Sequence, residues 1–181
     1  MQNRQGGQDE EDRRGRKDPK NRRKILIVDD SPSSVAIMER VLGDTYHLAI
    51  ATCGEEALEV APIFAPDLIL LDIMMPGIDG YETCRRLRTH PTLQHTKVIF
   101  VSGTDMVSDR LEAYAAGADD CLSKPFAPKE LLAKVQVYLR LKGTEDALRQ
   151  ARDELEQRVQ ARTEELAKIN DTLRTEIAER R

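Results

Sequence analysis

DLILLDIMMPGIDG, residues 67–80, is the stretch that decides the fold. Its first part, 67–71, is a strand candidate in which an unbroken apolar run at 68–71 follows Asp67, and such a run is typical of a strand buried on both faces of a parallel sheet. The run ends at Asp72, and Pro76-Gly77 then predicts a turn away from the sheet that leaves this carboxylate accessible. The stretch therefore indicates a buried strand with an acidic side chain at its carboxyl end, followed by a helix that begins near Gly80.

The same alternation continues on both sides of this stretch. Short apolar runs are separated by amphipathic segments, which predicts strands that alternate with helices. Strands are expected at 25–28, 46–51, 67–71, 97–101 and 118–122, and helices at 33–42, 54–63, 80–88, 105–116 and 128–142. Strict alternation requires right-handed crossovers, which place helices on both faces of one sheet. The predicted fold class is α/β, a doubly wound five-stranded parallel sheet.

The two ends of the chain have a different composition from this central part. Residues 1–24 contain no apolar side chain after Met1, so they have nothing to bury and are predicted to be a disordered leader. Residues 144–181 contain no Pro, Gly or aromatic residue and are rich in helix-forming side chains. We therefore divide the chain into a leader at 1–24, a globular domain at 25–142 and a long helix at 143–181, with Gly143-Thr144 as a possible hinge.

The long helix carries one apolar stripe. Its members are spaced by seven, four, seven, three and four residues, at Leu148, Leu155, Val159, Leu166, Ile169 and Leu173. A single stripe on a charged helix requires a partner, so a parallel dimeric coiled coil through residues 144–181 is expected. Arg152 and Arg162 fall on the seam and Ile177 breaks its register, which predicts moderate stability. The alternative is that the helix folds back on its own globular domain.

Composition restricts the classes of protein that the chain can belong to. A formal net charge of −4 gives no overall attraction to nucleic acid, and no compact helix-turn-helix unit follows residue 142, so DNA binding is not expected. The three cysteines are widely spaced without zinc-ligand patterns, which favours free thiols in a cytoplasmic protein. No apolar run is long enough to cross a membrane, and no secretory signal is evident.

Polar residues follow four of the five expected strands. The first strand ends in Asp29-Asp30, the third in Asp72, the fourth in Ser102 and the fifth in Ser123-Lys124-Pro125. Because parallel strands end at one edge of the sheet, this edge is expected to collect three carboxylates, a hydroxyl and an ammonium. A hard cation relieves the repulsion among the carboxylates, so the sequence predicts a Mg²⁺ site. Asp72 is then the candidate nucleophile for a phosphoryl group.

These segments resemble the receiver domain of two-component response regulators. The likeness covers about residues 24–142 and is carried by ILIVDDSPSS, DLILLDIMMPGIDGYETCRRLR, VIFVSGTD and AGADDCLSKPF. The resemblance implies a flavodoxin-like receiver fold and a domain that accepts a phosphoryl group from a histidine kinase or a phosphotransfer protein. Such a domain is a phosphoacceptor, with at most slow self-dephosphorylation, rather than an enzyme. The helix after residue 143 resembles signalling-helix linkers between receivers and output modules.

The resemblance also implies a role for each residue of the cluster. Asp29 and Asp30 would hold Mg²⁺ together with Asp72, the phosphoacceptor, while Met74 would offer its backbone carbonyl to the metal. Ser102 would be the switch hydroxyl, and Lys124, joined to Pro125 by a cis peptide bond, would pair with the phosphoryl group. Cys121 departs from the family pattern, because receivers often have an aromatic residue there that rotates on activation. We therefore expect the signal to leave through the backbone between Ser102 and Ala116.

Other interpretations of the chain remain open at this stage. The main alternative is a structural dimerisation module whose globular part is a pseudo-receiver that is never phosphorylated. A phosphatase with an Asp-x-Asp nucleophile is disfavoured because Ile73 and Met74 follow Asp72, and a flavin domain is disfavoured by the acidic edge. The chain ends at Arg181 without a helix terminator, so either an output module follows or the coiled coil is itself the docking surface.

Overall fold

The computed structural model describes residues 22–103 and 107–179 of the chain. The strands are β1 (Lys24–Val28), β2 (His47–Ala51), β3 (Leu68–Asp72), β4 (Lys97–Ser102) and β5 (Asp120–Ser123). The helices are α2 (Pro32–Leu42), α3 (Gly54–Phe64), α4 (Gly80–Thr89), α5 (Val107–Ala115) and α6 (Pro128–Glu179). Side chains of residues 104–110 lie outside the description, as do residues 1–21, where most of the predicted leader falls.

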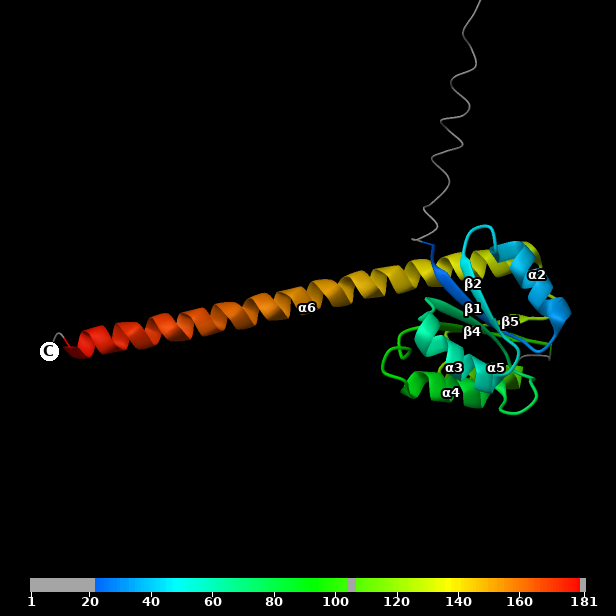
Figure 1. Cartoon of the computed structure of the whole chain (residues 1–181), viewed down its shortest axis with the longest axis horizontal. Coiled ribbons are helices and arrows are strands. Elements are labelled where there is room, and N and C mark those ends of the chain that lie inside the picture. The colour runs from blue at the N-terminus through cyan, green and yellow to red at the C-terminus, as the bar shows by residue number, and fades with distance from the viewer. Residues whose placement is uncertain (1–21, 104–106, 180–181) are drawn as a thin grey trace, which may run out of the picture. The chain divides into compact units, whose positions relative to one another are not determined.

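The five strands form one sheet in the order β2-β1-β3-β4-β5, and every pair is parallel. The predicted fold class is therefore confirmed. The observed strands agree with the expected ones to within two residues at each end, and a long C-terminal helix is present. Figure 1 shows the strands at the centre of the globular part, with helices arranged around them.

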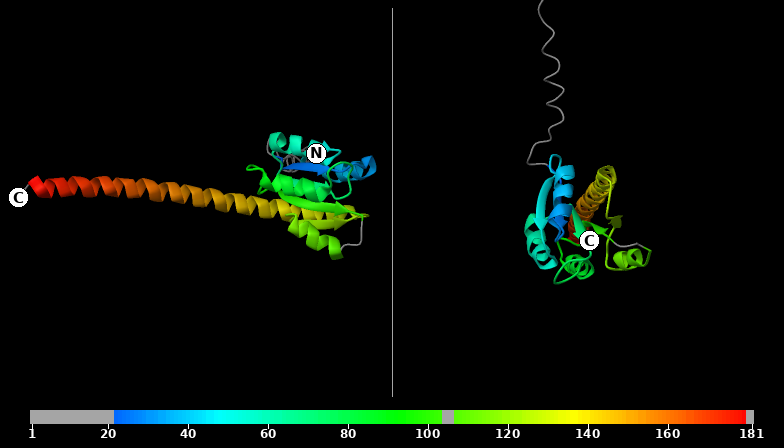
Figure 2. Two further views of the ribbon diagram at one scale, coloured as in Figure 1. Left: turned by 90° about the horizontal axis from the view of Figure 1, so that it is seen from below. Right: turned by 90° about the vertical axis from the view of Figure 1, so that its right-hand side faces the viewer.

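Two hydrophobic layers hold the helices on the sheet. On one face, α2 and α6 pack against the side chains of Ile25 and Ile27; on the other, α3, α4 and α5 pack against those of Leu26 and Val28. The end-on view of Figure 2 shows the helices on either side of the sheet. Because neighbouring residues point to opposite faces of the sheet and both are buried, the stretches 25–28 of β1 and 68–71 of β3 are apolar throughout. The continuous apolar runs of the sequence have this origin.

The strand register aligns the carboxyl ends of the central strands. Val28 pairs with Leu71, Asp72 with Val101, and Ser102 with Ser123. The residues that end or follow β1, β3, β4 and β5 are thereby brought to the same edge of the sheet. This edge is where open parallel sheets place their functional groups.

The helix α6 does not break at the predicted hinge. Gly143 and Thr144 lie inside one helix of 52 residues, and the Thr144 hydroxyl donates a hydrogen bond to the Leu141 carbonyl at 3.0 Å. A single glycine costs a helix only about 1 kcal/mol relative to alanine. Ion pairing between Lys142 and Asp146, one turn apart, favours the helix on either side of Gly143. The helix is therefore continuous through the possible hinge.

The apolar stripe of α6 is exposed. The described residues form two compact units, one ending at Arg140 and one beginning at Leu141. Within the second unit the six stripe residues have exposed fractions of 48–73%. The two seam arginines are paired with acids on their own helix, Arg152 with Asp153 at 2.8 Å and Arg162 with Glu165. The stripe is an unpaired apolar face, and its pairing as a coiled coil stays a prediction.

The start of the globular part differs from expectation by one residue. Lys24, which was placed in the leader, is the first residue of β1, and its ammonium donates a hydrogen bond to the Phe64 carbonyl at 3.0 Å. Its neighbour Arg23 pairs with Asp67 at 2.7 Å. The Lys24 backbone extends the sheet, where it pairs with His47 and its carbonyl accepts a hydrogen bond from the Asp67 amide at 2.8 Å. Among the described helices, none combines the length and the apolar character that a membrane crossing requires.

A partly buried ion network fastens the amino end of β4 to the segment before β5. The Asp119 carboxylate accepts hydrogen bonds from Arg88 at 2.9 Å, from Lys97 at 3.1 Å and from the Val98 amide at 2.9 Å. Arg88 also donates to the carbonyls of Gly117 at 2.8 Å and Thr96 at 2.5 Å. All of these contacts depend on the side chains of Arg88 and Asp119, and the network joins α4 to both strands.

Replacing Asp119 by alanine is expected to lower the free energy of unfolding by about 2–3 kcal/mol, because three donors in a partly buried site lose a shared charged acceptor. Urea denaturation monitored by circular dichroism measures the change. The matched control is Asp44→Ala, which removes an acid from an exposed turn and should change stability by less than about 0.5 kcal/mol. Equal losses in both variants would contradict the role assigned to Asp119.

Candidate functional site

Four polar side chains meet at the carboxyl edge of the sheet. Asp29 follows β1, Asp72 ends β3, Ser102 ends β4 and Lys124 follows β5. Asp29, Asp72 and Ser102 are buried, with exposed fractions of 1%, 7% and 0%. Burying two carboxylates beside each other is unfavourable unless something compensates for their charge. This edge is therefore organised for a purpose other than stability.

The three predicted carboxylates form one cluster. Asp29, Asp30 and Asp72 each place an oxygen within 4.8 Å of the others. Asp29 is oriented by the Ser31 amide, which donates to its carboxylate at 2.9 Å, while Asp30 is exposed. Three carboxylate oxygens at this separation, one of them open to solvent, fit a hard divalent cation that retains some of its water. The donor set therefore suits Mg²⁺.

Lys124 reaches across the edge to two of these acids. Its ammonium lies 2.7 Å from an oxygen of Asp29 and 3.0 Å from an oxygen of Asp72. The backbone amide of Lys124 donates to the Ser102 carbonyl at 2.6 Å, which ties the end of β5 to the end of β4. The Lys124–Pro125 peptide bond is cis, as the sequence resemblance implies. The bridge to Asp29 was not expected from the sequence.

The cluster changes the acidity of its members. Burial raises the pKa of Asp72 above its ordinary value, the Asp29 charge adds to the rise, and the hydrogen bond and charge of Lys124 oppose it. Burial lowers the pKa of Lys124, but the two carboxylates outweigh this effect and leave its pKa above the ordinary value. Lys124 is therefore charged at neutral pH, and its charge partly offsets the repulsion between the two acids.

The loop from Ile73 to Asp79 borders the acidic cluster. The side chain of Met74 is 73% exposed, and its backbone amide donates to the Asp72 carboxylate. At the far end of the loop, the Gly80 amide donates to the Ile73 carbonyl at 2.9 Å, which closes the loop at its base. Gly77 has φ of +82°, a left-handed conformation that favours glycine. The predicted turn at Pro76-Gly77 is present.

The segment expected to transmit the signal is only partly described. Residues 104–106 lie outside the described residues, whereas Ser102 at its start and Ala116 at its end are buried. Cys121, which occupies the usual aromatic position, is 4% exposed on β5. The three histidines stand apart from the cluster: His47 packs on Phe64 with ring centroids 5.2 Å apart, and His90 and His95 lie near the end of α4 and beyond it.

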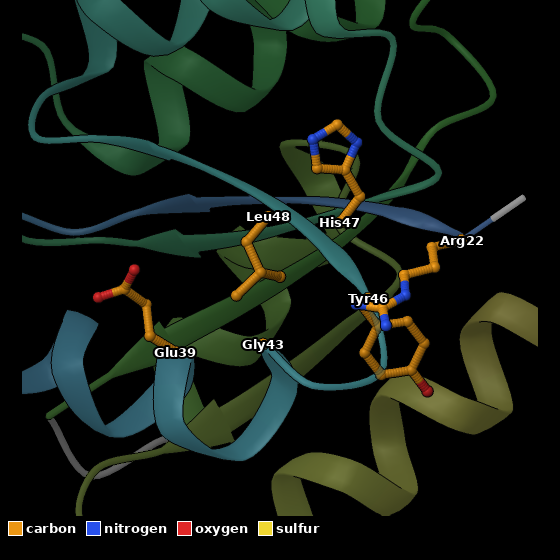
Figure 3. A pocket seen from close by; sticks show the side chains of 6 residues that line it. All are labelled: Arg22, Glu39, Gly43, Tyr46, His47 and Leu48. Atoms are coloured by element: carbon orange, nitrogen blue, oxygen red, sulfur yellow. The ribbon is translucent and has the colours of Figure 1, made fainter. Parts of the chain in front are cut away.

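Two surface hollows lie at opposite ends of the sheet. One, of about 340 Å³, borders the acidic edge and is lined by Ser34, Ile37, Lys124, Pro125 and Phe126. The other, of about 490 Å³, lies at the amino end of β2, and Figure 3 shows the side chains around it, from Arg22 to Leu48. Because the amino and carboxyl ends of parallel strands lie on opposite edges, the second hollow does not belong to the candidate site.

The cysteines are free thiols, as expected. Burial raises the pKa of the Cys84 thiol from its ordinary value of 9.0 to about 11. At pH 8 the native protein should therefore be alkylated by iodoacetamide faster at the half-exposed Cys53 than at the buried Cys84, by at least about tenfold, because the thiolate is the nucleophile and Cys84 is both buried and protonated. Peptide mass mapping reads both rates, and unfolding should abolish the difference. Equal labelling of the two thiols in the native state would contradict the assigned burial.

The same shift links Cys84 to stability. The folded state holds the proton more tightly than the unfolded state, so the contribution of the thiol is intact below pH 9 and declines as the pH rises through about 11.

A five-stranded parallel sheet in this order, with an acidic cluster and a lysine at its carboxyl edge, defines the class of receiver-like α/β domains. A family model described as the response regulator receiver domain matches residues 25–136, so the chain belongs to that family. The expectation drawn from the sequence motifs is thereby confirmed.

Two relatives show how far the likeness extends. The response regulator PleD of Caulobacter vibrioides is 39% identical over 128 residues, which are 70% of this chain and 28% of PleD. A "Probable cyclic di-GMP phosphodiesterase" of Vibrio cholerae is 36% identical over 149 residues, 82% of this chain and 34% of that protein. The chain thus spans about a third of the length of these relatives, and its match to the second extends into α6.

Solved receiver domains have the same fold. The receiver domain of the sensor histidine kinase PA1611 from Pseudomonas aeruginosa, solved with a magnesium ion coordinated in its active-site cleft, is 29% identical and gives a TM-score of 0.61. The match covers 65% of this chain and 97% of that one. The part of the chain that corresponds to it is the globular domain.

Proposed function

We propose that this chain is a Mg²⁺-dependent phosphoacceptor in which Asp72 takes a phosphoryl group from a histidine kinase or a phosphotransfer protein. One observation carries the proposal: Asp29, Asp30 and Asp72 converge within 4.8 Å while Lys124 bridges two of them. Such a set of charges is costly to assemble, and it suits the transfer of a group with several negative oxygens.

The chemical step needs little beyond orientation and charge. A carboxylate oxygen of Asp72 attacks phosphorus, the bond from phosphorus to the donor nitrogen breaks, and the donor imidazole leaves with that electron pair. Lys124 can turn from the carboxylates to an oxygen of the arriving group, and Ser102 at the end of β4 can donate a hydrogen bond to another. The product is an acyl phosphate on Asp72 and a neutral imidazole on the donor.

Asp29, Asp30 and Asp72 would hold the metal through their carboxylates, and Met74 would add its backbone carbonyl. Bound there, Mg²⁺ supplies positive charge that offsets the repulsion between the carboxylates and the incoming phosphoryl oxygens. The magnesium ion in the homologous cleft of PA1611 supports this assignment. No second acid follows Asp72 two residues later, so a phosphoacceptor, with at most slow self-dephosphorylation, is favoured over a multiple-turnover phosphatase.

We further propose that phosphorylation shifts the population between two arrangements of the segment from Ser102 to Ala116 and of the first turns of α6. Two contacts connect β5 and the residue just before it with these turns. The Tyr138 hydroxyl donates to the Asp119 carbonyl at 3.1 Å, and Lys134 pairs with Asp120 at 2.5 Å. Cys121 is too small to report the change by rotating a ring, so a backbone route is proposed instead.

The output would pass through a homodimer. In this proposal residues 1–24 are a leader, 25–142 the receiver and 143–181 a signalling helix that pairs with a second copy through the apolar stripe. PleD and the Vibrio cholerae protein are about three to four times as long as the part that matches this chain, which is compatible with an output domain or a partner beyond Arg181. Neither DNA binding nor a membrane span is part of the proposal, and the site of action is the cytoplasm.

The deciding experiment is mass measurement of the intact chain after incubation with acetyl phosphate. With Mg²⁺ the chain should gain one phosphoryl group, and with EDTA it should gain none. The alternative of a structural dimerisation module with a pseudo-receiver predicts no gain under either condition, together with no heat of Mg²⁺ binding in a calorimetric titration. That pair of results would overturn the proposal.

A further inference from the structure

The loop that borders the acidic cluster is held from outside by one acidic side chain. Glu55, in the first turn of α3, accepts a hydrogen bond from the Ile78 amide at 3.2 Å. Among the hydrogen bonds of the described residues, this one joins the outer part of the loop, residues 75–78, to a different element. The remaining fastenings of the loop lie at its base, where Gly80 meets Ile73, and at Met74, which donates to Asp72.

The backbone around this contact is shaped to admit the carboxylate. A Cβ placed on Gly77 would lie 2.7 Å from one Glu55 oxygen and 3.0 Å from the other, so the glycine lets the loop approach the acid closely. A Cβ on Gly54 would lie 2.6 Å from a side-chain carbon of Ile78 and 2.2 Å from the Thr83 hydroxyl. Two glycines, one on each partner, therefore allow the start of α3 to dock on the loop.

The charge of Glu55 suits this role. Hydrogen bonds from its own backbone amide and from the Ile78 amide, with smaller contributions from the Cys53 thiol and the Arg86 charge, hold the pKa of Glu55 below its ordinary value. The side chain is thus an ionised acceptor at neutral pH. A charged acceptor forms a stronger hydrogen bond with an amide than a neutral one does.

We propose that Glu55 is a positioning residue for the phosphoacceptor site: by holding Ile78 it keeps the backbone at Met74 in place beside Asp72. This inference rests on the proposed function, since Met74 matters only if its carbonyl takes part in the Mg²⁺ site. Glu55 touches neither the metal ligands nor the reacting atoms. It acts through the loop, and its loss is felt as weaker binding of the cation.

The mechanism is one of preorganisation. A metal ligand on a loop contributes less affinity when the loop must be ordered at the moment of binding, because the ordering entropy is then subtracted from the binding free energy. Residues near a metal that orient its ligands commonly change its affinity by about tenfold or more when they are removed. Glu55 is exposed, so water competes for its hydrogen bond; an effect of about three- to tenfold is therefore expected.

The test is a calorimetric titration of Mg²⁺ into the full chain and into three variants. Glu55→Ala should weaken Mg²⁺ binding about three- to tenfold, whereas Glu55→Gln, which retains an acceptor oxygen, should bind within about twofold of the parent. Glu59→Ala removes the same charge from an exposed position one turn later on α3 and should bind as the parent does. Melting temperatures measured alongside should agree within a few degrees.

A second readout follows the contact itself. Without Mg²⁺, hydrogen exchange at the Ile78 amide should be faster in Glu55→Ala than in the parent by about threefold or more, and unchanged in Glu59→Ala. Parental Mg²⁺ affinity in Glu55→Ala would overturn the inference, as would equal losses in the alanine and glutamine variants. If the parent itself binds no Mg²⁺, the proposed function fails and this inference fails with it. If the parent binds Mg²⁺ but Glu55→Ala binds it as tightly as the parent, the proposed function stands and only this inference fails.

Discussion

Asp72→Asn should abolish phosphorylation of the chain by acetyl phosphate. Asparagine has nearly the volume of aspartate and can accept the Lys124 hydrogen bond through its amide oxygen, so the site should fold as before. The amide, however, is a very poor nucleophile, because its lone pairs are delocalised and no negative charge remains on oxygen. The expected loss in rate is at least about a thousandfold, which places the product below detection by intact mass.

Two measurements separate loss of the nucleophile from loss of the fold. The thermal melt of Asp72→Asn should be no lower than that of the parent, since the substitution removes one of two adjacent buried acids. Asp44→Asn makes the same chemical change in an exposed turn and should be phosphorylated at the parental rate. A phosphoryl group on Asp72→Asn, mapped to Asp29, Asp30 or Ser102, would reassign the acceptor and refute the roles proposed here.

Much of the fold and the composition of the site could be predicted, because a chain in which strands alternate with helices has few possible topologies. Once five apolar runs are recognised as strands, right-handed crossovers make the sheet parallel, so the carboxyl ends of all the strands lie at one edge. The residues that follow the strands are then brought together by topology alone. This is why the sequence predicts that Asp29, Asp72 and Lys124, which are far apart along the chain, lie at one edge. The Lys124 ammonium is 2.7 Å from Asp29 and 3.0 Å from Asp72.

The features that could not be predicted depend on which distant groups a side chain contacts and on the balance of small free-energy terms along a helix. The Glu55 contact joins an exposed acid to a backbone amide 23 residues later. An acid in the first turn of a helix already interacts favourably with the helix dipole, so its position in the sequence gives no hint of a longer-range contact. Asp119 was assigned only to a strand, although its carboxylate organises Arg88 and Lys97. Gly143 is a possible hinge because glycine has a low helix propensity, but the strong helix formers around it outweigh the free-energy cost of one glycine.

The second large effect is expected at the apolar stripe of α6. The residues Leu148, Arg152, Leu155, Val159, Arg162, Leu166, Ile169 and Leu173 follow one another at spacings of four and three in strict alternation, the a and d positions of a heptad. Each stripe leucine is at least half exposed in the single chain. Burial of a leucine contributes about 1.5–3 kcal/mol, so pairing two such stripes gives a dimer a substantial driving force.

Leu155→Glu combined with Leu166→Glu should therefore convert the dimer to a monomer. Four leucines are lost per dimer, and the carboxylates that replace them would face one another across the seam, which should weaken association by at least about a thousandfold. Sedimentation equilibrium measures the change. The matched control, Ala161→Glu with Ala167→Glu, adds the same two charges outside the heptad seam and should leave the dimer intact. A monomeric parent chain, or equal dissociation of both double variants, would show that the stripe is not the dimer interface.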